Sequence, residues 1–300
     1  MTSSGFPVHA VTPPSREENV VADINSLSDL KYRIQELLQS TLDHSSITVM
    51  QEKLLLKQRS SYHFVIQTEE PRSTSDSINV IWCYLGPDRL WHVKSWIRTQ
   101  IELLLAYLEM LFQEITISRQ NLEAFVAKCE QVEVDTDEVA SAEQKLQQIQ
   151  QYIRDFEERM ASNIEPLTLN SLFLCGRGPL FSLVQMSVLT LGPVMFNREK
   201  SLPSYNSICL FWYIVGEQSE ESGCVFRVEV KSVAPQEKLL REAICFNYVY
   251  SVQNLKPNTC YKFTVKRMPN ITLVYEPWID TLHLKTLSSR QQNKGSKGCQ

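Results

Sequence analysis

The sequence predicts an α+β multidomain protein, in which an N-terminal helical bundle or long helical hairpin precedes an antiparallel β-sandwich. Neither Gly nor Pro occurs at positions 15–70 or 88–165, and these are the residues that normally interrupt a helix. Eight of the 13 prolines fall between Pro166 and Pro277, among runs of β-branched and aromatic residues. From Ile208 onward apolar residues recur with a period of two, which is the period of a β-strand.

The composition argues against several classes of function. The 30 Lys and Arg residues are matched by 34 Asp and Glu, and this balance argues against a nucleic-acid or membrane partner. Only 9 of the 300 residues are glycine, which leaves little material for a phosphate-binding loop. The first residues lack the basic and apolar stretches of a secretory signal, and the most apolar window, residues 101–112, is too short to cross a bilayer. We therefore expect an intracellular, cytoplasmic protein.

A helical domain is expected over residues 23–165, after a disordered N-terminus at residues 1–22. Ser26 or Ser28 is placed to cap its first helix. The apolar residues of that helix, at intervals of three and four, are Leu27, Leu30, Ile34 and Leu37.

Two further helices are expected in this domain. A second helix is expected within Ser46–Ile66, although the apolar pattern loses its register after Lys57. Asp88 can then cap a long helix whose apolar series runs from Leu90 to Cys129. A helix of about 42 residues is roughly 60 Å long, because each residue adds 1.5 Å.

The most regular pattern in the chain is a heptad seam at residues 139–160, which gives the domain coiled-coil character. Its members, at alternating intervals of three and four, are Val139, Ala142, Leu146, Ile149, Ile153, Phe156 and Met160. The short acidic connector at residues 133–138 favours an antiparallel hairpin with the preceding helix. The alternative is a structural homodimer, in which the seams of two copies pack together.

The sandwich is expected over residues 193–287. An apolar docking segment at residues 166–192 precedes it, and a disordered tail at residues 288–300 follows it. The expected strands, each with alternating or continuous apolar residues, are Ile208–Ile214, Cys224–Val230, Ala243–Val252, Tyr261–Lys266 and Asp280–Thr286.

One motif makes the sandwich specific. Leu255, Pro257 and Tyr261 form a Leu-x-Pro-x-Thr-x-Tyr sequence ahead of an alternating strand, which resembles the fibronectin type III signature. In such a tyrosine corner the hydroxyl of Tyr261 would bond a buried backbone acceptor a few residues upstream. Trp212, on an inward-facing position of an earlier strand, matches the core tryptophan of this module.

The resemblance extends beyond this generic signature. Residues 192–200, 210–214, 261–267 and 273–280 are similar to the family of fibronectin type III domain-containing protein 11. The resemblance implies an intracellular, non-enzymatic protein, and it supplies no catalytic or binding residues. The chain departs from common fibronectin modules at residues 267–278, where a proline- and aromatic-containing segment replaces the usual Gly-rich loop.

Catalytic and metal-binding patterns are absent from the sequence. None of the five histidines lies in a metal-binding or catalytic motif, and we expect His92 to lie on the surface. We therefore expect no enzyme activity, no cofactor and no metal. By strand alternation Cys209, Cys245 and Cys260 should point outward as free thiols.

The candidate interaction residues are Tyr275, Glu276 and Trp278, just before the last strand. Exposed aromatic residues are favoured anchors of protein interfaces, although Trp278 could instead pack against the helical domain or cap the end of the sandwich. We expect an adaptor that binds unknown protein partners. Besides the homodimer through residues 139–160, a secreted adhesive module is a further alternative.

Overall fold

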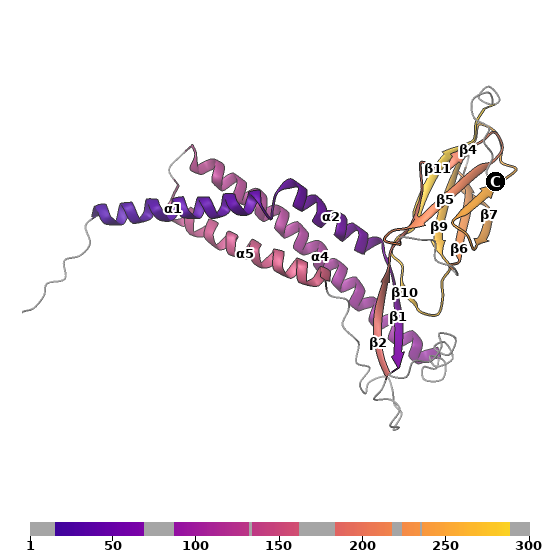
Figure 1. Cartoon of the computed structure of the whole chain (residues 1–300), viewed down its shortest axis with the longest axis horizontal. Helices are drawn as coiled ribbons and strands as arrows, with labels where there is room; N and C mark the ends of the chain where they lie inside the picture. Colours follow the sequence, from indigo (N-terminus) through magenta and orange to yellow (C-terminus); the bar gives the residue numbers. More distant parts are fainter. Residues whose placement is uncertain are drawn as a thin grey trace, which may run out of the picture. The chain divides into compact units, whose positions relative to one another are not determined.

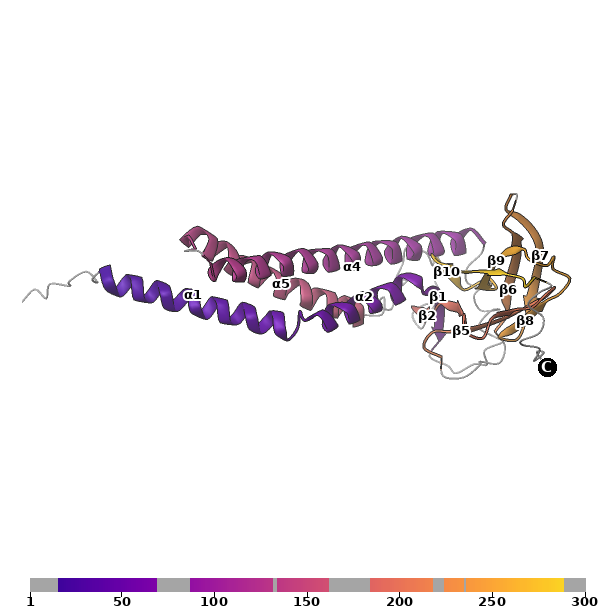
Figure 2. The same ribbon diagram turned by 90° about the horizontal axis from the view of Figure 1, so that it is seen from above.

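A computed structural model of the chain describes residues 16–68, 87–131, 134–161, 184–217, 224–234 and 236–288 (Figures 1 and 2). It has two compact units, each made of two separate stretches of sequence. The first unit comprises residues 1–51 and 109–158, and the second comprises residues 52–108 and 159–300.

The first unit is helical. It contains α1 (Arg16–Gln39), the start of α2 (His44–Arg59), the C-terminal part of α4 (Pro87–Cys129) and most of α5 (Thr136–Ala161). Here α4 and α5 lie side by side and antiparallel, as the hairpin interpretation predicts (Figures 1 and 2). The rings of Phe112 and Phe156 are 6.4 Å apart across this pair.

The heptad seam of α5 forms the core of the helical unit. Its buried members are Ala142, Leu146, Ile149, Ile153 and Phe156. Two ion pairs connect α1 to the hairpin, because Lys31 contacts Glu130 at 3.3 Å and Arg33 contacts Glu143 at 3.5 Å. The seam is therefore covered by residues of the same chain.

Two expected helix boundaries are wrong. The first helix begins at Arg16, so neither Ser26 nor Ser28 caps it, and residues 16–22 are helical instead of disordered. The second helix ends at Arg59, and a strand, β1 (Ser61–Thr68), occupies residues where helix was expected. The β-branched and aromatic side chains after Ser61 favour the extended conformation, which explains the lost helical register. Residues 1–15, 166–183 and 289–300 lie outside the described residues.

The second unit contains a small antiparallel sheet on the N-terminal part of α4 (Figure 1). Its strand order is β10 (Leu273–Tyr275), β1 and β2 (Val184–Leu191), and β1 pairs with β2 from Ser61↔Leu191 to Thr68↔Val184. The residues buried between sheet and helix are Tyr62, Phe64, Leu90, Val93, Ile97, Ile101, Leu105 and Val188.

The same unit contains the β-sandwich. One sheet has the order β11 (Asp280–Lys285), β9 (Cys260–Arg267), β6 (Phe226–Ser232) and β7 (Lys238–Cys245). In the other sheet, β5 (Ile208–Ile214) pairs with β3 (Val194–Phe196), β4 (Leu202–Pro203) and β8 (Val249–Val252). The inward side chains of both sheets form one core, so the predicted fold class is confirmed.

Two of the three cysteine expectations are wrong. Residues 243–252 form two strands in different sheets instead of one, which breaks the alternation and turns Cys245 into the core. Cys209 is disulfide-bonded and is not a free thiol. Cys260 is exposed and free, as expected.

No helix in the described part of the chain has a segment with the length and hydropathy needed to span a membrane.

Candidate interaction sites

Trp212 and Tyr261 lie in the core of the sandwich. Their exposed fractions are 3% and 2%, and the Trp212 ring packs edge-on against Phe226 with centroids 5.6 Å apart. The hydroxyl of Tyr261 accepts a hydrogen bond from the backbone N–H of Lys256 at 2.8 Å. Leu255 is buried beside it, while Pro257 is exposed in the turn. These residues support the fold and carry no reactive group that faces solvent.

The segment between β9 and β11 brings Tyr275 and Trp278 against other parts of the same unit. Through β10, Tyr275 pairs with Tyr62 of β1, and the two rings are 6.3 Å apart. The guanidinium of Arg98 lies 5.3 Å from the centre of the Tyr275 ring, and that of Arg59 lies 5.1 Å from the Trp278 ring. We call these contacts the junction. They hold the segment between β9 and β11 against β1, α4 and the end of α2.

Glu276 lies at the junction, half-buried between the two aromatic residues. Burial raises the pKa of its carboxyl group, and the charges of Lys266 and Arg267 partly oppose this effect. The cavity beside it, bounded by Arg59, Gly192 and Trp278 among others, has a volume of about 10 Å³. That volume is about what one water molecule requires, so the cavity does not suit an organic ligand.

His63 lies on β1 beside the junction. It was not predicted as a site residue, because residues up to Ile66 were expected to be helical. It is only 6% exposed, and its two ring nitrogens lie 3.2 Å from the hydroxyls of Thr272 and Ser61. Burial, and then the charge of Arg267, lower the pKa of His63 to about 4. The pairing of Ser61 with His63 is not a nucleophilic site, since the exposed fraction of Ser61 is only 4%.

The sandwich contains a largely buried ion pair near the junction. Arg267 binds Glu217 at 2.7 Å, and the exposed fractions of the two side chains are 14% and 19%. Gly192, which connects β2 to β3, lies so close to Val215 that a Cβ atom would be 1.9 Å from its carbonyl oxygen. This position therefore requires glycine.

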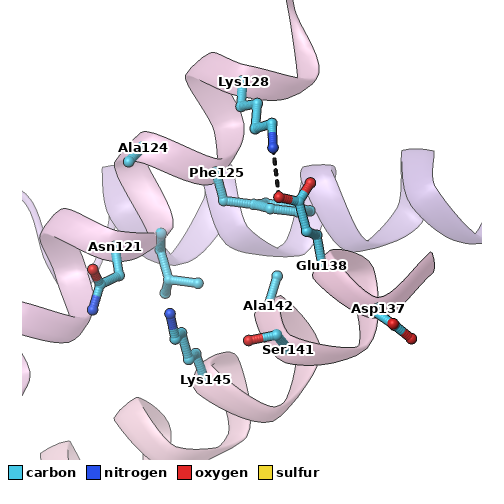
Figure 3. Close-up of a pocket in the computed structure, with 10 residues that line it drawn as sticks. Asn121, Ala124, Phe125, Lys128, Asp137, Glu138, Ser141, Ala142 and Lys145 are labelled. Atoms are coloured by element: carbon cyan, nitrogen blue, oxygen red, sulfur yellow. Dashed lines mark hydrogen bonds and ion pairs between the residues drawn. The ribbon is translucent and has the colours of Figure 1, made fainter. Parts of the chain in front are cut away.

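A larger pocket, of about 420 Å³, lies in the helical unit between the end of α4 and the start of α5 (Figure 3). Figure 3 shows the ammonium group of Lys128 meeting the carboxylate of Glu138 beside the ring of Phe125. Lys145 and Asp137 add one further charge of each sign. This mixed lining presents no excess charge and no nucleophile–base pair, and among the described residues no cluster of three or more His, Cys, Asp or Glu could hold a metal.

An exposed apolar surface of the sandwich follows β7 and the turn into β8. We call it the β7 patch. Its members and their exposed fractions are Leu239 (48%), Leu240 (49%), Ile244 (56%) and Phe246 (71%). β7 and β11 are the two outer strands of the same sheet, so the patch lies at the edge opposite β11. This surface was not predicted from the sequence, because residues 243–252 were expected to form one strand.

The C-terminal part of the chain matches known proteins. Residues 191–293 match the model of a family of unknown function (DUF5581), described as an Fn3-like domain. Fibronectin type III domain-containing protein 11 of Bos taurus is 33% identical over 108 residues, which cover 34% of this chain and 32% of that protein. Its Homo sapiens counterpart is 33% identical over 99 residues, which cover 31% of this chain and 30% of that protein.

The chain thus matches about a third of the length of these curated relatives. Among solved structures, the crystal structure of FN3tt is 22% identical and covers 31% of this chain and 88% of its own, with a TM-score of 0.22. The topology of the sandwich and the family match together identify the C-terminal part of the chain as a fibronectin type III-like domain, similar in sequence to that of fibronectin type III domain-containing protein 11.

Proposed function

We propose that the chain is a non-enzymatic, intracellular adaptor, in which the β7 patch of the fibronectin type III-like domain binds a protein partner. The observation that carries the proposal is the exposure of four large apolar side chains along β7 and the turn that follows it. Contiguous exposed apolar surface on a folded domain is typical of protein interaction sites. Phe246, at 71% exposed, is the strongest candidate for an anchor.

The aromatic residues of the junction have a structural role, which leaves the β7 patch as the binding surface of this proposal. Tyr275 and Trp278 already contact Tyr62, Arg98 and Arg59 of the same chain. The two aromatic rings are therefore engaged in contacts within the unit. The β7 patch lies on the opposite outer strand from β11, where it can bind a partner without disturbing the junction.

The intracellular location belongs to the same proposal. The described residues include four free thiols, as is usual in a reducing compartment: Cys129, Cys224, Cys245 and Cys260. Cys209, by contrast, forms a disulfide. Fractionation of cells that express the tagged chain tests this location directly. Recovery only from the culture medium would contradict it.

Proximity labelling in cells tests the binding function. The double variant Ile244→Lys/Phe246→Lys places two charges on the β7 patch and should lose a reproducible set of labelled partners. Leu202→Lys is a matched control, because Leu202 is 61% exposed and lies on β4 of the other sheet. Both variants should unfold at the same temperature as the wild type. Partners that are retained equally by both variants would contradict the proposal.

A further inference from the structure

The β7 patch surrounds an edge strand. Within the described residues β6 is the only strand that pairs with β7. Backbone N–H and C=O groups of alternate residues on the outer side of β7 therefore have no ladder partner. A row of such groups is the surface to which another extended segment adds as a strand.

The regular part of this edge is short. β7 pairs with β6 without interruption from Cys245↔Phe226 to Arg241↔Val230. The register then shifts, because the next pair is Leu239↔Lys231, so Leu240 forms a bulge. A bulge bends a strand and ends regular pairing. The residues available to a new strand are therefore the five from Arg241 to Cys245.

The side chains along this stretch point to both sides of the sheet. Glu242 and Ile244 lie opposite Glu229 and Arg227, whose side chains alternate with the buried ones of β6, so they point away from the core. Ile244 is 56% exposed. An added strand would therefore place an apolar side chain beside Ile244 on the outer face of the sheet.

The charges along β7 favour a partner of opposite sign. Glu242 already forms an ion pair with Arg227 at 3.1 Å. Lys238 and Arg241 form no ion pair with any residue that the structure describes, and both are exposed. Two cations beside an open strand edge are complementary to a segment that carries carboxylates.

A second copy of the chain fits this edge poorly. When two copies continue one sheet across a two-fold axis, the axis passes through a residue that faces its own equivalent. An axis at Arg241 or at Glu242 sets like charges opposite each other, which is destabilising. An axis at Ala243 sets Glu242 opposite Ile244 and Arg241 opposite Cys245, so neither charge gains a partner. An axis at Ile244 pairs only residues 243–245 of the regular stretch, so Arg241 and Glu242 again gain no partner.

We propose that β7 binds an extended segment of a partner protein as an added strand along residues 241–245. Acidic residues of the segment would lie near Arg241 and the flanking Lys238, and apolar residues near Ile244 and the flanking Phe246. This inference rests on the proposed function and specifies the chemistry of the partner. The backbone of the segment supplies the pairing, and its side chains supply the selectivity.

Peptides selected from a random library against the full chain provide the probe. The best binder is then synthesised in two forms, with N-methyl groups on either set of alternate residues. Only one set faces β7 in an added strand, so only one form should bind about tenfold or more weakly, because it loses donors for two or more hydrogen bonds. Equal weakening by both forms, or by neither, would overturn strand addition. Loss of partners by Ile244→Lys/Phe246→Lys would still support the proposed function in that case.

Charge reversal tests the second half of the inference. Lys238→Glu/Arg241→Glu should weaken the selected peptide by about tenfold, and the loss should shrink as salt is added. Lys285→Glu, at an exposed position of β11, is the matched control and should leave binding unchanged. Selected peptides without Asp or Glu would contradict the acidic partner. Light scattering that shows a dimer of the wild type, dissociated by Arg241→Glu, would replace it with a second copy.

Discussion

The phenolic oxygen of Tyr261 lies 2.8 Å from the backbone nitrogen of Lys256 and accepts its proton in a hydrogen bond. The sequence analysis expected a backbone acceptor at this point, whereas the structure has a backbone donor. The bond closes the turn that leads into β9, where Asn258 adopts a left-handed conformation with a φ of 51°. A side chain in the core thus fixes the path of the chain between the two sheets.

Tyr261→Phe should lower the free energy of unfolding by about 1 kcal/mol or more, because the Lys256 N–H loses its acceptor. Chemical denaturation followed by tryptophan fluorescence measures the loss. Tyr213→Phe is the control, since the Tyr213 ring is 44% exposed and should tolerate the loss of its hydroxyl. Equal midpoints for the two variants would count against a structural role for this hydrogen bond.

Asp280 joins the first and last strands of the sandwich. Its carboxylate accepts hydrogen bonds from the Phe196 N–H at 2.8 Å and from the Arg198 guanidinium at 2.8 and 3.2 Å, and Asp280 is only 3% exposed. Asp280→Asn should destabilise the sandwich by about 2 kcal/mol, because one oxygen becomes a donor that faces other donors. Urea unfolding should show no comparable loss for Glu199→Gln, which changes an exposed neighbour of Arg198.

Helices and strands were predicted correctly from the sequence where the local apolar pattern agrees with the tertiary environment. The helices α4 and α5 were predicted because their apolar residues recur at helical spacing and no helix breaker intervenes. The strands β5, β6 and β9 were predicted because one face of each is buried, which produces alternation. Tyr261 was placed in the core because the signature that contains it has a defined geometry, and Trp212 because it lies on the inward face of an alternating strand.

The junction could not be predicted, because it depends on pairing between distant segments. His63 and Tyr275 lie more than two hundred positions apart, yet both belong to the small sheet. The short apolar run of β1 looks the same in the sequence as the end of a helix. Its strand partners, β2 and β10, lie far away in the chain, so the local pattern does not reveal them. Cys245 was misplaced for a related reason, because one break between β7 and β8 reverses the parity of every residue before it.

Acidification should destabilise the second unit through His63. The pKa of His63 is 6.5 in the unfolded chain and about 4 in the folded chain, so the unfolded chain binds a proton over this range while the folded chain does not. The contribution is therefore fully present above pH 6.5 and is lost as pH falls towards about 4. The loss should be on the order of 3 kcal/mol.

The variant His63→Gln isolates this effect, because glutamine keeps hydrogen-bonding groups but does not titrate. Urea midpoints measured at several pH values should fall more steeply for the wild type than for His63→Gln. Parallel pH profiles for the two proteins would show that His63 contributes nothing to the acid sensitivity of the fold.

The contact of Arg59 with Trp278 should be energetically coupled. A double-mutant cycle with Arg59→Met and Trp278→Leu should give an interaction energy of about 0.5–1 kcal/mol, as expected for a partly exposed cation–π pair. A second cycle, of Arg59→Met with Leu202→Ala, should be additive, because Leu202 lies on β4 and is not part of the junction. Additivity in both cycles would contradict a stabilising role for the cation–π contact.

The heptad seam of α5 should behave as a core within one chain. Ile149 is fully buried, so Ile149→Ala should lower the free energy of unfolding of the helical unit by about 3 kcal/mol. Gln147→Ala, on the exposed face of the same helix, should have little effect. The decisive measurement is the unfolding midpoint of the wild type, followed by circular dichroism over a hundredfold or so range of protein concentration. A seam within one chain gives a constant midpoint, whereas a seam shared by two copies gives a midpoint that rises with concentration.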